Sequence, residues 1–204
     1  ARGEVVETPR EMFQRVARAV AEAERAFGAD DRDVAAAAGR FARAMTGGVF
    51  LPNSPTLMNA GRELGLLSAC FVLPVNDSIE SIFESVKVTA LIQKAGGGTG
   101  FAFDRLRPTG DVIATSGGTT SGPISFWRVF SEATNAIQQG AFRRGANMGM
   151  MNVTHPDVLR FVTAKQRLDA FENFNISVKV SEAFMDAAER TPHAPHVVIN
   201  PRDG

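Results

Sequence analysis

Apolar side chains recur at helical spacing over the first 48 residues. Thr8, Pro9 and Glu11 have the pattern of a capping box with proline at the first helical position, which predicts that a helix begins there. A second helix is predicted to end at Gly47 and Gly48. The apolar positions of the two helices are Met12, Phe13, Val16, Val20, Ala23, Phe27, Val34, Ala38, Phe41 and Met45. We therefore expect a helical N-terminal domain over residues 1–48, whose apolar residues form a core rather than a site.

From Phe50 onward, short apolar runs alternate with amphipathic segments. The predicted strands are 68–73, 101–103, 148–153, 174–180 and 197–199. The predicted helices are 77–90, 122–137, 156–165 and 181–189, the first of them with Asp77 and Glu80 in capping positions. Strands that alternate with helices predict an α/β domain over residues 49–204, with at least partly parallel strands. The pattern is open-ended, so we expect the chain to be a fragment of a longer protein.

Composition narrows the function. Lys plus Arg and Asp plus Glu are 22 each, so no global positive charge points to nucleic acid or to an anionic membrane. No apolar run approaches the roughly 18 residues that a membrane span needs, and the N-terminus does not resemble a signal peptide. A cytoplasmic protein is expected. The single cysteine excludes an internal disulfide, and the three scattered histidines predict no metal site.

Cys70 and a glycine-rich loop are the first candidates for chemistry. A lone cysteine in an apolar strand, here after Ser68 and Ala69, is usually an inert buried residue. The loop over 96–100 is not a P-loop, because no Gly-Lys-Ser/Thr follows, and it lies before a strand instead of a helix. Its glycines could bring backbone amides against a ligand or allow close packing of strands.

Charged and polar positions supply further candidates. Asp77 and Ser78 are first of all helix-capping residues, although a helix N-terminus also binds anions. Arg105 and Arg107 could hold a phosphate, as could the second basic turn at 143–147; solvated surface arginines are the alternative.

The histidines carry weaker signals. His155, which precedes Pro156, is predicted to begin a helix. His193 and His196 are predicted to be surface residues.

The order and spacing of these motifs resemble the large subunits of ribonucleotide reductases over roughly residues 50–190. The runs that carry the resemblance are 50–61, 68–74, 77–79, 94–101, 105–108 and 143–149. The triple-glycine loop and the Arg-Arg-Gly-Ala-Asn-Met run are most similar to the adenosylcobalamin-dependent class. A class that uses a tyrosyl radical on a separate small subunit is the alternative; this chain contains no tyrosine.

The resemblance implies a helical domain followed by the first part of a ten-stranded α/β barrel, with adenosylcobalamin as the cofactor of the full-length protein. In this family a cysteine thiyl radical abstracts a ribose hydrogen, and two further cysteines reduce the sugar and close to a disulfide. Cys70 matches the first cysteine of that pair. Ser54, Ala69 and Gly96 match positions that, with Cys70, bind the ribonucleotide substrate.

The resemblance also implies regulation. Asp77, Ser78, Ile79 and Arg107 match the allosteric specificity site, which holds a deoxynucleoside triphosphate. In some members a further arginine follows, where this chain has Val112–Thr115. The implied partners are the substrate, the effector, a thioredoxin-like reductant, the remainder of the barrel and a second copy of the full protein.

The Asn-x-Cys-x-Glu motif of the radical cysteine and the second redox cysteine do not occur in this sequence. We therefore expect the chain alone to be inactive as a reductase. Two alternatives are a deoxynucleotide-binding regulatory module without catalysis of its own and a purely structural part of a barrel.

Overall fold

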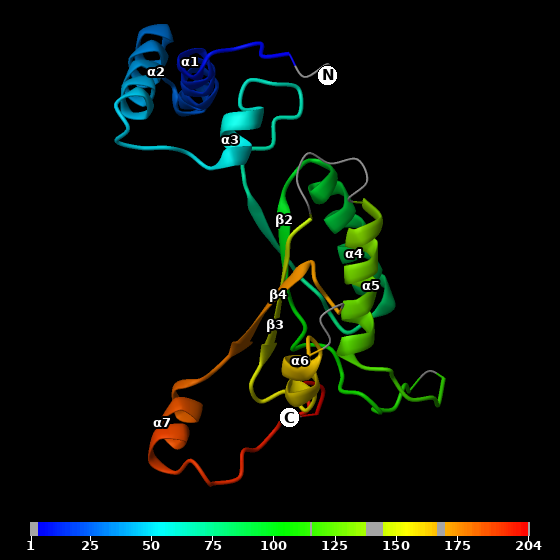
Figure 1. Ribbon diagram of the computed structural model, residues 1–204. Helices are drawn as coiled ribbons and strands as arrows, with labels where there is room; N and C mark the ends of the chain where they lie inside the picture. Colours follow the sequence, from blue (N-terminus) through cyan, green and yellow to red (C-terminus); the bar gives the residue numbers. More distant parts are fainter. Residues whose placement is uncertain (1–3, 115, 138–144, 167–169, 204) are drawn as a thin grey trace. The chain divides into compact units, whose positions relative to one another are not determined.

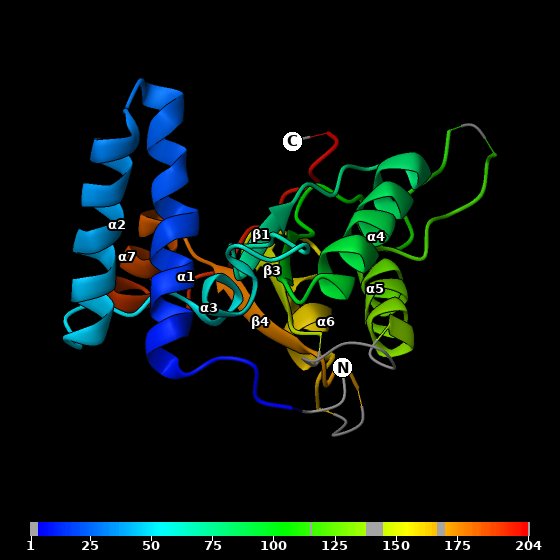
Figure 2. The same ribbon diagram turned by 90° about the horizontal axis from the view of Figure 1, so that it is seen from above.

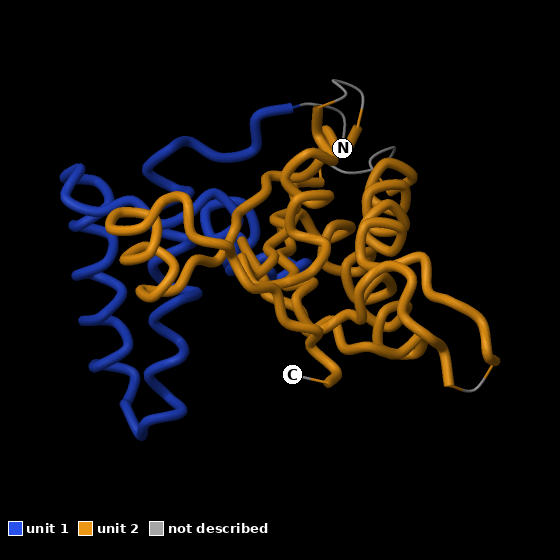
Figure 3. The backbone as a smooth tube through the Cα atoms, turned by 90° about the horizontal axis from the view of Figure 1, so that it is seen from below, with its two compact units in different colours: residues 1–69 blue, residues 70–204 orange. Residues whose placement is uncertain are grey.

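The structure is a computed structural model that describes residues 4–114, 116–137, 145–166 and 170–203. Its contacts divide the chain into two compact units, Ala1–Ala69 and Cys70–Gly204 (Figure 3). Each unit is described below by itself.

The first unit is helical, as the sequence predicts. Its elements are α1 (Pro9–Ala21), the 3-10 helix η1 (Glu22–Phe27), α2 (Asp31–Thr46) and α3 (Ser54–Asn59). The capping box is confirmed, since the Thr8 amide donates to the Glu11 carboxylate at 2.7 Å and the Glu11 amide donates to Thr8 Oγ1 at 3.3 Å. Phe27 is not a core residue: η1 changes the helical phase, and the side chain is 87% exposed.

An arginine of α1 holds the segment that contains α3. Arg15 donates to the carbonyl oxygens of Leu57, at 2.9 Å, and Ala60. Its guanidinium also pairs with Glu7 at 2.7 Å, and Arg62 donates to the same carboxylate. The hydrogen bond from Arg15 lowers the pKa of Glu7. Because Leu57 and Ala60 also pack on the core of α1, the compact unit extends beyond Gly48.

The second unit contains a sheet of four parallel strands in the order β1-β2-β3-β4 (Figure 1). The strands are β1 (Cys70–Leu73), β2 (Gly98–Ala102), β3 (Asn147–Asn152) and β4 (Phe174–Lys179). The helices are α4 (Ile79–Lys94), α5 (Pro123–Ile137), α6 (Val158–Thr163) and α7 (Glu182–Arg190). Figures 1 and 2 show α4 and α5 side by side along one face of the sheet. The α/β class is confirmed, and every described strand pair is parallel.

An aromatic core fixes this covered face. Phe101 of β2 lies 4.5 Å from Phe130 of α5, measured between ring centroids, and Trp127 stacks on Phe171 at 3.8 Å. Trp127 and Phe130 are wholly buried. Aromatic burial of this extent is a large part of the stability of a small domain, and here it attaches α5 to the sheet.

Three strand predictions need correction. Gly98 and Gly100, predicted as loop, are strand residues of β2. Residues 197–199 form no strand, although the Ile199 amide donates to the Thr154 carbonyl at 2.7 Å. The third correction concerns β1, which is not a buried strand: its four residues are alternately exposed and half-buried.

Candidate functional site

The N-terminus of α4 is the first candidate site. Ser78 is the N-cap, and its hydroxyl accepts from the Ser81 amide at 3.1 Å. The predicted capping role of Ser78 is therefore confirmed, whereas the predicted capping pair of Asp77 and Glu80 is wrong. The Asp77 carboxylate points instead to a different segment of the chain.

Asp77 binds Arg107. Asp77 Oδ2 accepts from Arg107 Nε at 2.7 Å, and Oδ1 accepts from the Arg107 amide at 3.1 Å. The two side chains are 24% and 22% exposed. Two contacts from one carboxylate to the backbone and the guanidinium orient the arginine more strictly than a single ion pair would. The terminal nitrogens of Arg107 carry the N–H groups from which a phosphate could accept.

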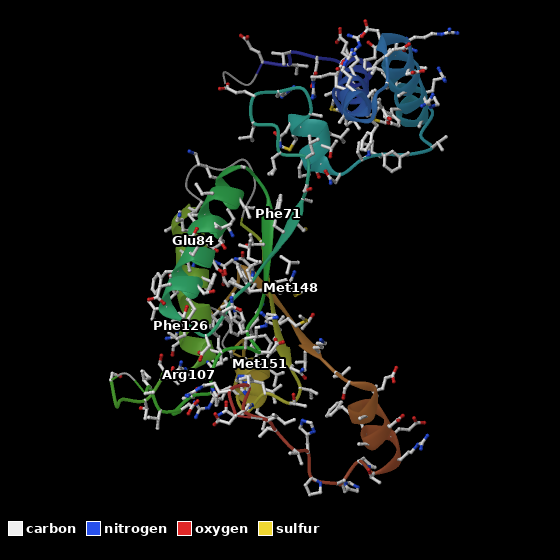
Figure 4. The ribbon with its side chains drawn as sticks, turned by 180° about the vertical axis from the view of Figure 1, so that it is seen from behind. Phe71, Glu84, Arg107, Phe126, Met148 and Met151 are labelled. Carbon is white, nitrogen blue, oxygen red and sulfur yellow. The ribbon has the colours of Figure 1, made fainter. Side chains whose placement is uncertain are left out.

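A pocket of about 380 Å³ lies at this place. Its lining residues are Asp77, Ser78, Ile79, Glu80, Ile82, Arg107, Ile113, Thr120 and Phe126. Figure 4 shows Arg107 and Phe126 near the same end of the α4 and α5 pair. The structure thus brings together all four residues predicted for the effector site. An aromatic ring, a guanidinium and the first amides of a helix are groups that suit a base and its phosphates.

Arg105, the other arginine predicted to hold a phosphate beside Arg107, does not line this pocket. Arg105 is exposed and donates to Asn76 Oδ1 at 3.1 Å, so it does not form a fork with Arg107. Arg143 and Arg144 lie outside the described residues.

Cys70 is the second candidate site. It begins β1 opposite Gly98 of β2, and it is exposed. Phe71 and Leu73 point to the side that α4 and α5 cover, whereas Cys70 and Val72 lie on the other face. Val72 is 87% exposed. Figure 4 marks Phe71 and Met148 on the strands of this sheet. The thiol therefore lies on an open face, and the expectation that Cys70 is buried is wrong.

The predicted substrate residues are distributed over both units. Gly96 lies after α4 with φ +91°, and a β-carbon there would meet nothing within 4 Å. Glycine is thus favoured at position 96 by the backbone conformation and not by a lack of space for a side chain. Ser54 is exposed at the start of α3, and Ala69 is half-buried at the end of the first unit. Ser54 and Ala69 belong to the first unit, whereas Cys70 and Gly96 belong to the second.

A buried polar network, which the sequence did not reveal, lies beside the amino ends of β2 and β3. Asn147 Oδ1 accepts from Gln93 Nε2 at 2.8 Å and from Thr99 Oγ1 at 2.6 Å. Asn147 Nδ2 donates to Thr134 Oγ1 at 2.9 Å. All four side chains are buried. The network joins α4 and α5 to the sheet close to Gly96 and Cys70. Its only signal in the sequence is an asparagine at the start of an apolar strand.

Two of the three histidines have defined hydrogen-bond partners. His155 is buried and does not begin α6, which starts at Val158. Its Nε2 lies 2.8 Å from the Leu106 carbonyl oxygen, and His196 Nε2 lies 2.9 Å from that of Val153. His193 is exposed. Over the described ranges, no group of three His, Cys, Asp or Glu could hold a metal ion. In the same part of the chain, no helix is long and apolar enough to cross a membrane.

The fold and the sites define a parallel α/β domain. It has a pocket at the N-terminus of a helix and an exposed thiol at the start of its first strand. Two family models match the chain: the ribonucleotide reductase all-alpha domain over residues 1–65, and the ribonucleotide reductase barrel domain over residues 68–203. The chain belongs to the ribonucleotide reductase large-subunit family.

Curated relatives agree. A vitamin B12-dependent ribonucleoside-diphosphate reductase of Thermoplasma acidophilum is 52% identical, over 80% of this chain and 21% of the relative. The protein of that name from Mycobacterium tuberculosis is 47% identical, over 99% of this chain and 29% of the relative. The ribonucleoside-diphosphate reductase large chain of Schizosaccharomyces pombe is 32% identical, over 92% of this chain and 23% of the relative. The chain thus spans less than a third of the length of these relatives.

Proposed function

We propose that the chain is part of a ribonucleoside-diphosphate reductase in which Cys70 is one of the two cysteines that reduce the substrate. The observation that carries the proposal is the exposed thiol at the amino end of β1, within the segment that matches the reductase barrel. An exposed thiol on an open strand face can meet both a sugar and a second thiol. A disulfide requires the two Cα atoms to approach within about 7 Å.

The proposed reaction is balanced by two thiols. Cys70 and the second cysteine each give one hydrogen atom and become a disulfide. The ribose 2′-hydroxyl leaves as water, and hydrogen takes its place on the sugar. A thioredoxin-like dithiol then reduces the disulfide by exchange. Ser54, Ala69 and Gly96 are proposed, on the resemblance to the family, to bind the substrate.

Adenosylcobalamin is the proposed cofactor, because the relatives from T. acidophilum and M. tuberculosis are named as vitamin B12-dependent. When bound, it supplies the radical that starts the reaction. His155 Nε2 and His196 Nε2 each lie against a backbone carbonyl, so neither nitrogen is placed as a cobalt ligand.

The pocket at α4 is the proposed effector site for a deoxynucleoside triphosphate. Asp77 orients Arg107 toward the phosphates, Ser78 and Ile79 present the first turn of α4, and Phe126 offers an aromatic surface to the base. Ile79, Phe83 and Leu91 are exposed along the same helix. Exposed apolar residues on one helix suit a subunit contact, so we propose that the full protein is a homodimer. We also propose that it acts in the cytoplasm.

The test is reduction of cytidine diphosphate by the full-length protein with adenosylcobalamin and dithiothreitol. We expect Cys70→Ser to abolish repeated turnover, because a hydroxyl cannot form the disulfide. Ser68→Ala, two residues before it and exposed, is the control that should retain turnover within about threefold, the range of an ordinary surface substitution. Wild-type turnover by Cys70→Ser would refute the role of Cys70. Turnover by residues 1–204 alone would refute the expectation that this part is inactive by itself.

A further inference from the structure

His155 and Asp157 hold the segment that carries Arg107. Both belong to the turn between β3 and α6, and they are 2% and 4% exposed. His155 Nε2 lies 2.8 Å from the carbonyl oxygen of Leu106, the residue before Arg107. Asp157 Oδ2 accepts from the amide of Thr109, two residues after Arg107, at 2.7 Å. The turn thus binds the backbone on both sides of the arginine.

The hydrogen bonds fix the protonation of the imidazole. His155 Nδ1 accepts from the Asp157 amide at 3.0 Å, so its proton must be on Nε2. Nε2–H then donates to Leu106 oxygen, and both ring nitrogens are satisfied. The ring acts as a rigid connection between the turn and residue 106.

These two residues do not line the pocket at α4, whereas Arg107 does. The Arg107 amide and Nε both bind Asp77. Arg107 Nη1 also lies 3.5 Å from the Val112 carbonyl oxygen, at the limit of a hydrogen bond. The position of the guanidinium therefore depends mainly on Asp77 in the pocket and on the backbone that the β3–α6 turn holds. If the turn released Leu106 and Thr109, the segment that carries Arg107 would lose its two buried side-chain anchors.

We propose that His155 and Asp157 are positioning residues of the effector site, which set Arg107 for the phosphates of a deoxynucleoside triphosphate. This inference rests on the proposed function of the pocket. It assigns a role in ligand affinity to a buried histidine and a buried aspartate that do not touch the ligand.

The test is titration of the full-length protein with dTTP, and separately with dATP, by isothermal calorimetry. His155→Leu removes both ring hydrogen bonds, and Asp157→Ala removes the acceptor for Thr109. Each should weaken binding by about five- to tenfold, the ratio that corresponds to one backbone hydrogen bond. The conservative variants are His155→Gln, which retains a donor for Leu106, and Asp157→Asn, which retains an acceptor for Thr109. They should bind within about twofold of the wild type.

A general loss of stability must be separated from positioning. Phe161→Leu is the matched control, because Phe161 is wholly buried on α6 and takes no part in these side-chain hydrogen bonds. It should lower the melting temperature without changing nucleotide affinity. If Phe161→Leu weakens binding as much as Asp157→Ala at an equal loss of melting temperature, positioning is refuted. Wild-type affinity in both His155→Leu and Asp157→Ala refutes it as well.

Arg107→Ala distinguishes failure of the inference from failure of the proposed function. If Arg107→Ala binds dTTP and dATP normally, the pocket is not the effector site and both ideas are overturned. If Arg107→Ala loses binding while the variants at 155 and 157 retain it, only the positioning role is wrong.

Discussion

Asn147→Asp should destabilise the amino ends of β2 and β3, although it changes one NH₂ group into an oxygen. Asn147 is 3% exposed, and its NH₂ group donates to Thr134 Oγ1 at 2.9 Å. The Thr134 hydroxyl already donates to the Phe130 carbonyl at 2.8 Å. In the aspartate variant, two oxygen acceptors therefore face each other without a proton between them. Gln93 and Thr99 can still donate to the other carboxylate oxygen.

The magnitude has two parts. Loss of one buried hydrogen bond with an acceptor left unpaired costs about 1–3 kcal/mol. Burial also raises the pKa of a carboxyl group, and each unit of that rise adds about 1.4 kcal/mol at a pH above it. The lost hydrogen bond and the cost of a buried charge together amount to about 3 kcal/mol at neutral pH. The pKa is higher in the folded state than in the unfolded state. The second part is therefore relieved as the pH falls through the folded pKa, and it is complete at neutral pH.

Hydrogen exchange of the full-length protein, read by mass spectrometry on peptides that cover residues 93–102 and 147–152, measures this local opening. Asn135→Asp is the control. It places the same charge on the exposed side of α5, and the carboxylate can still accept from Asn173 Nδ2. We expect Asn135→Asp to lower the free energy of local opening by less than about 0.5 kcal/mol, the usual effect of a surface substitution. Equal protection of these amides in the two variants would refute the reasoning. So would a loss of protection in Asn147→Asp that does not decrease in acid.

Two further predictions concern other parts of the chain. In thermal unfolding, Gly122→Ala should lower the free energy of unfolding by more than about 2 kcal/mol, because φ is +79° and the new β-carbon would lie 2.1 Å from Thr109 Oγ1. The control Gly117→Ala, at φ +69° with open space around it, should lower it by about 1 kcal/mol. Equal melting temperatures of the two variants would contradict this prediction. Because the hydrogen bond from Arg15 lowers the pKa of Glu7, the stability that this pair adds is present above the usual pKa of glutamate and is lost as the pH falls through the folded value. Hydrogen exchange of residues 4–21 should therefore become faster in acid in the wild type, after correction for the intrinsic rate. Glu7→Gln should reduce that change without abolishing it, because hydrogen bonds with Thr8 also lower the pKa of Glu11 in the same segment; an unchanged acid response in the variant would contradict the assignment.

Local patterns were sufficient for most elements of the fold. The capping box at Thr8, the glycine stop after α2 and the proline start of α5 are encoded within a few residues, and the structure has each of them. Phe27 was misplaced because a 3-10 helix, whose period differs from that of an α-helix, follows α1. Of the two neighbouring capping candidates, Ser78 is the N-cap, and the different role of Asp77 is not visible locally because its partner Arg107 lies 30 positions away. Pairings across such a separation have no local pattern.

The same reason explains what was missed around the sites. Asn147 and Gln93 are 54 positions apart, and His155 is 49 positions from Leu106. The local sequence indicates only a helix start at His155 and Pro156, which the structure does not have. It shows Asn147 only as the residue before an apolar run. Their functions as anchors exist only once the parallel order of the strands has brought the segments together. The resemblance to reductases identified the residues proposed to touch ligands, but not the residues that hold them.

Cys70 shows how strongly a site can depend on strand register. Phe71 and Leu73 face α4 and α5, so the two-residue alternation of a strand places Cys70 and Val72 on the opposite face. A shift of β1 by one residue against β2 would put the thiol under the helices and a phenylalanine on the open face. The pairing of Cys70 with Gly98 prevents this, because Phe71 must then lie beside Thr99 and against Gly97, where a β-carbon would come within 3.0 Å of the Phe71 ring. The small residue at position 97 thus helps to keep the Phe71 ring on the covered face and, by alternation, the Cys70 sulfur on the open face.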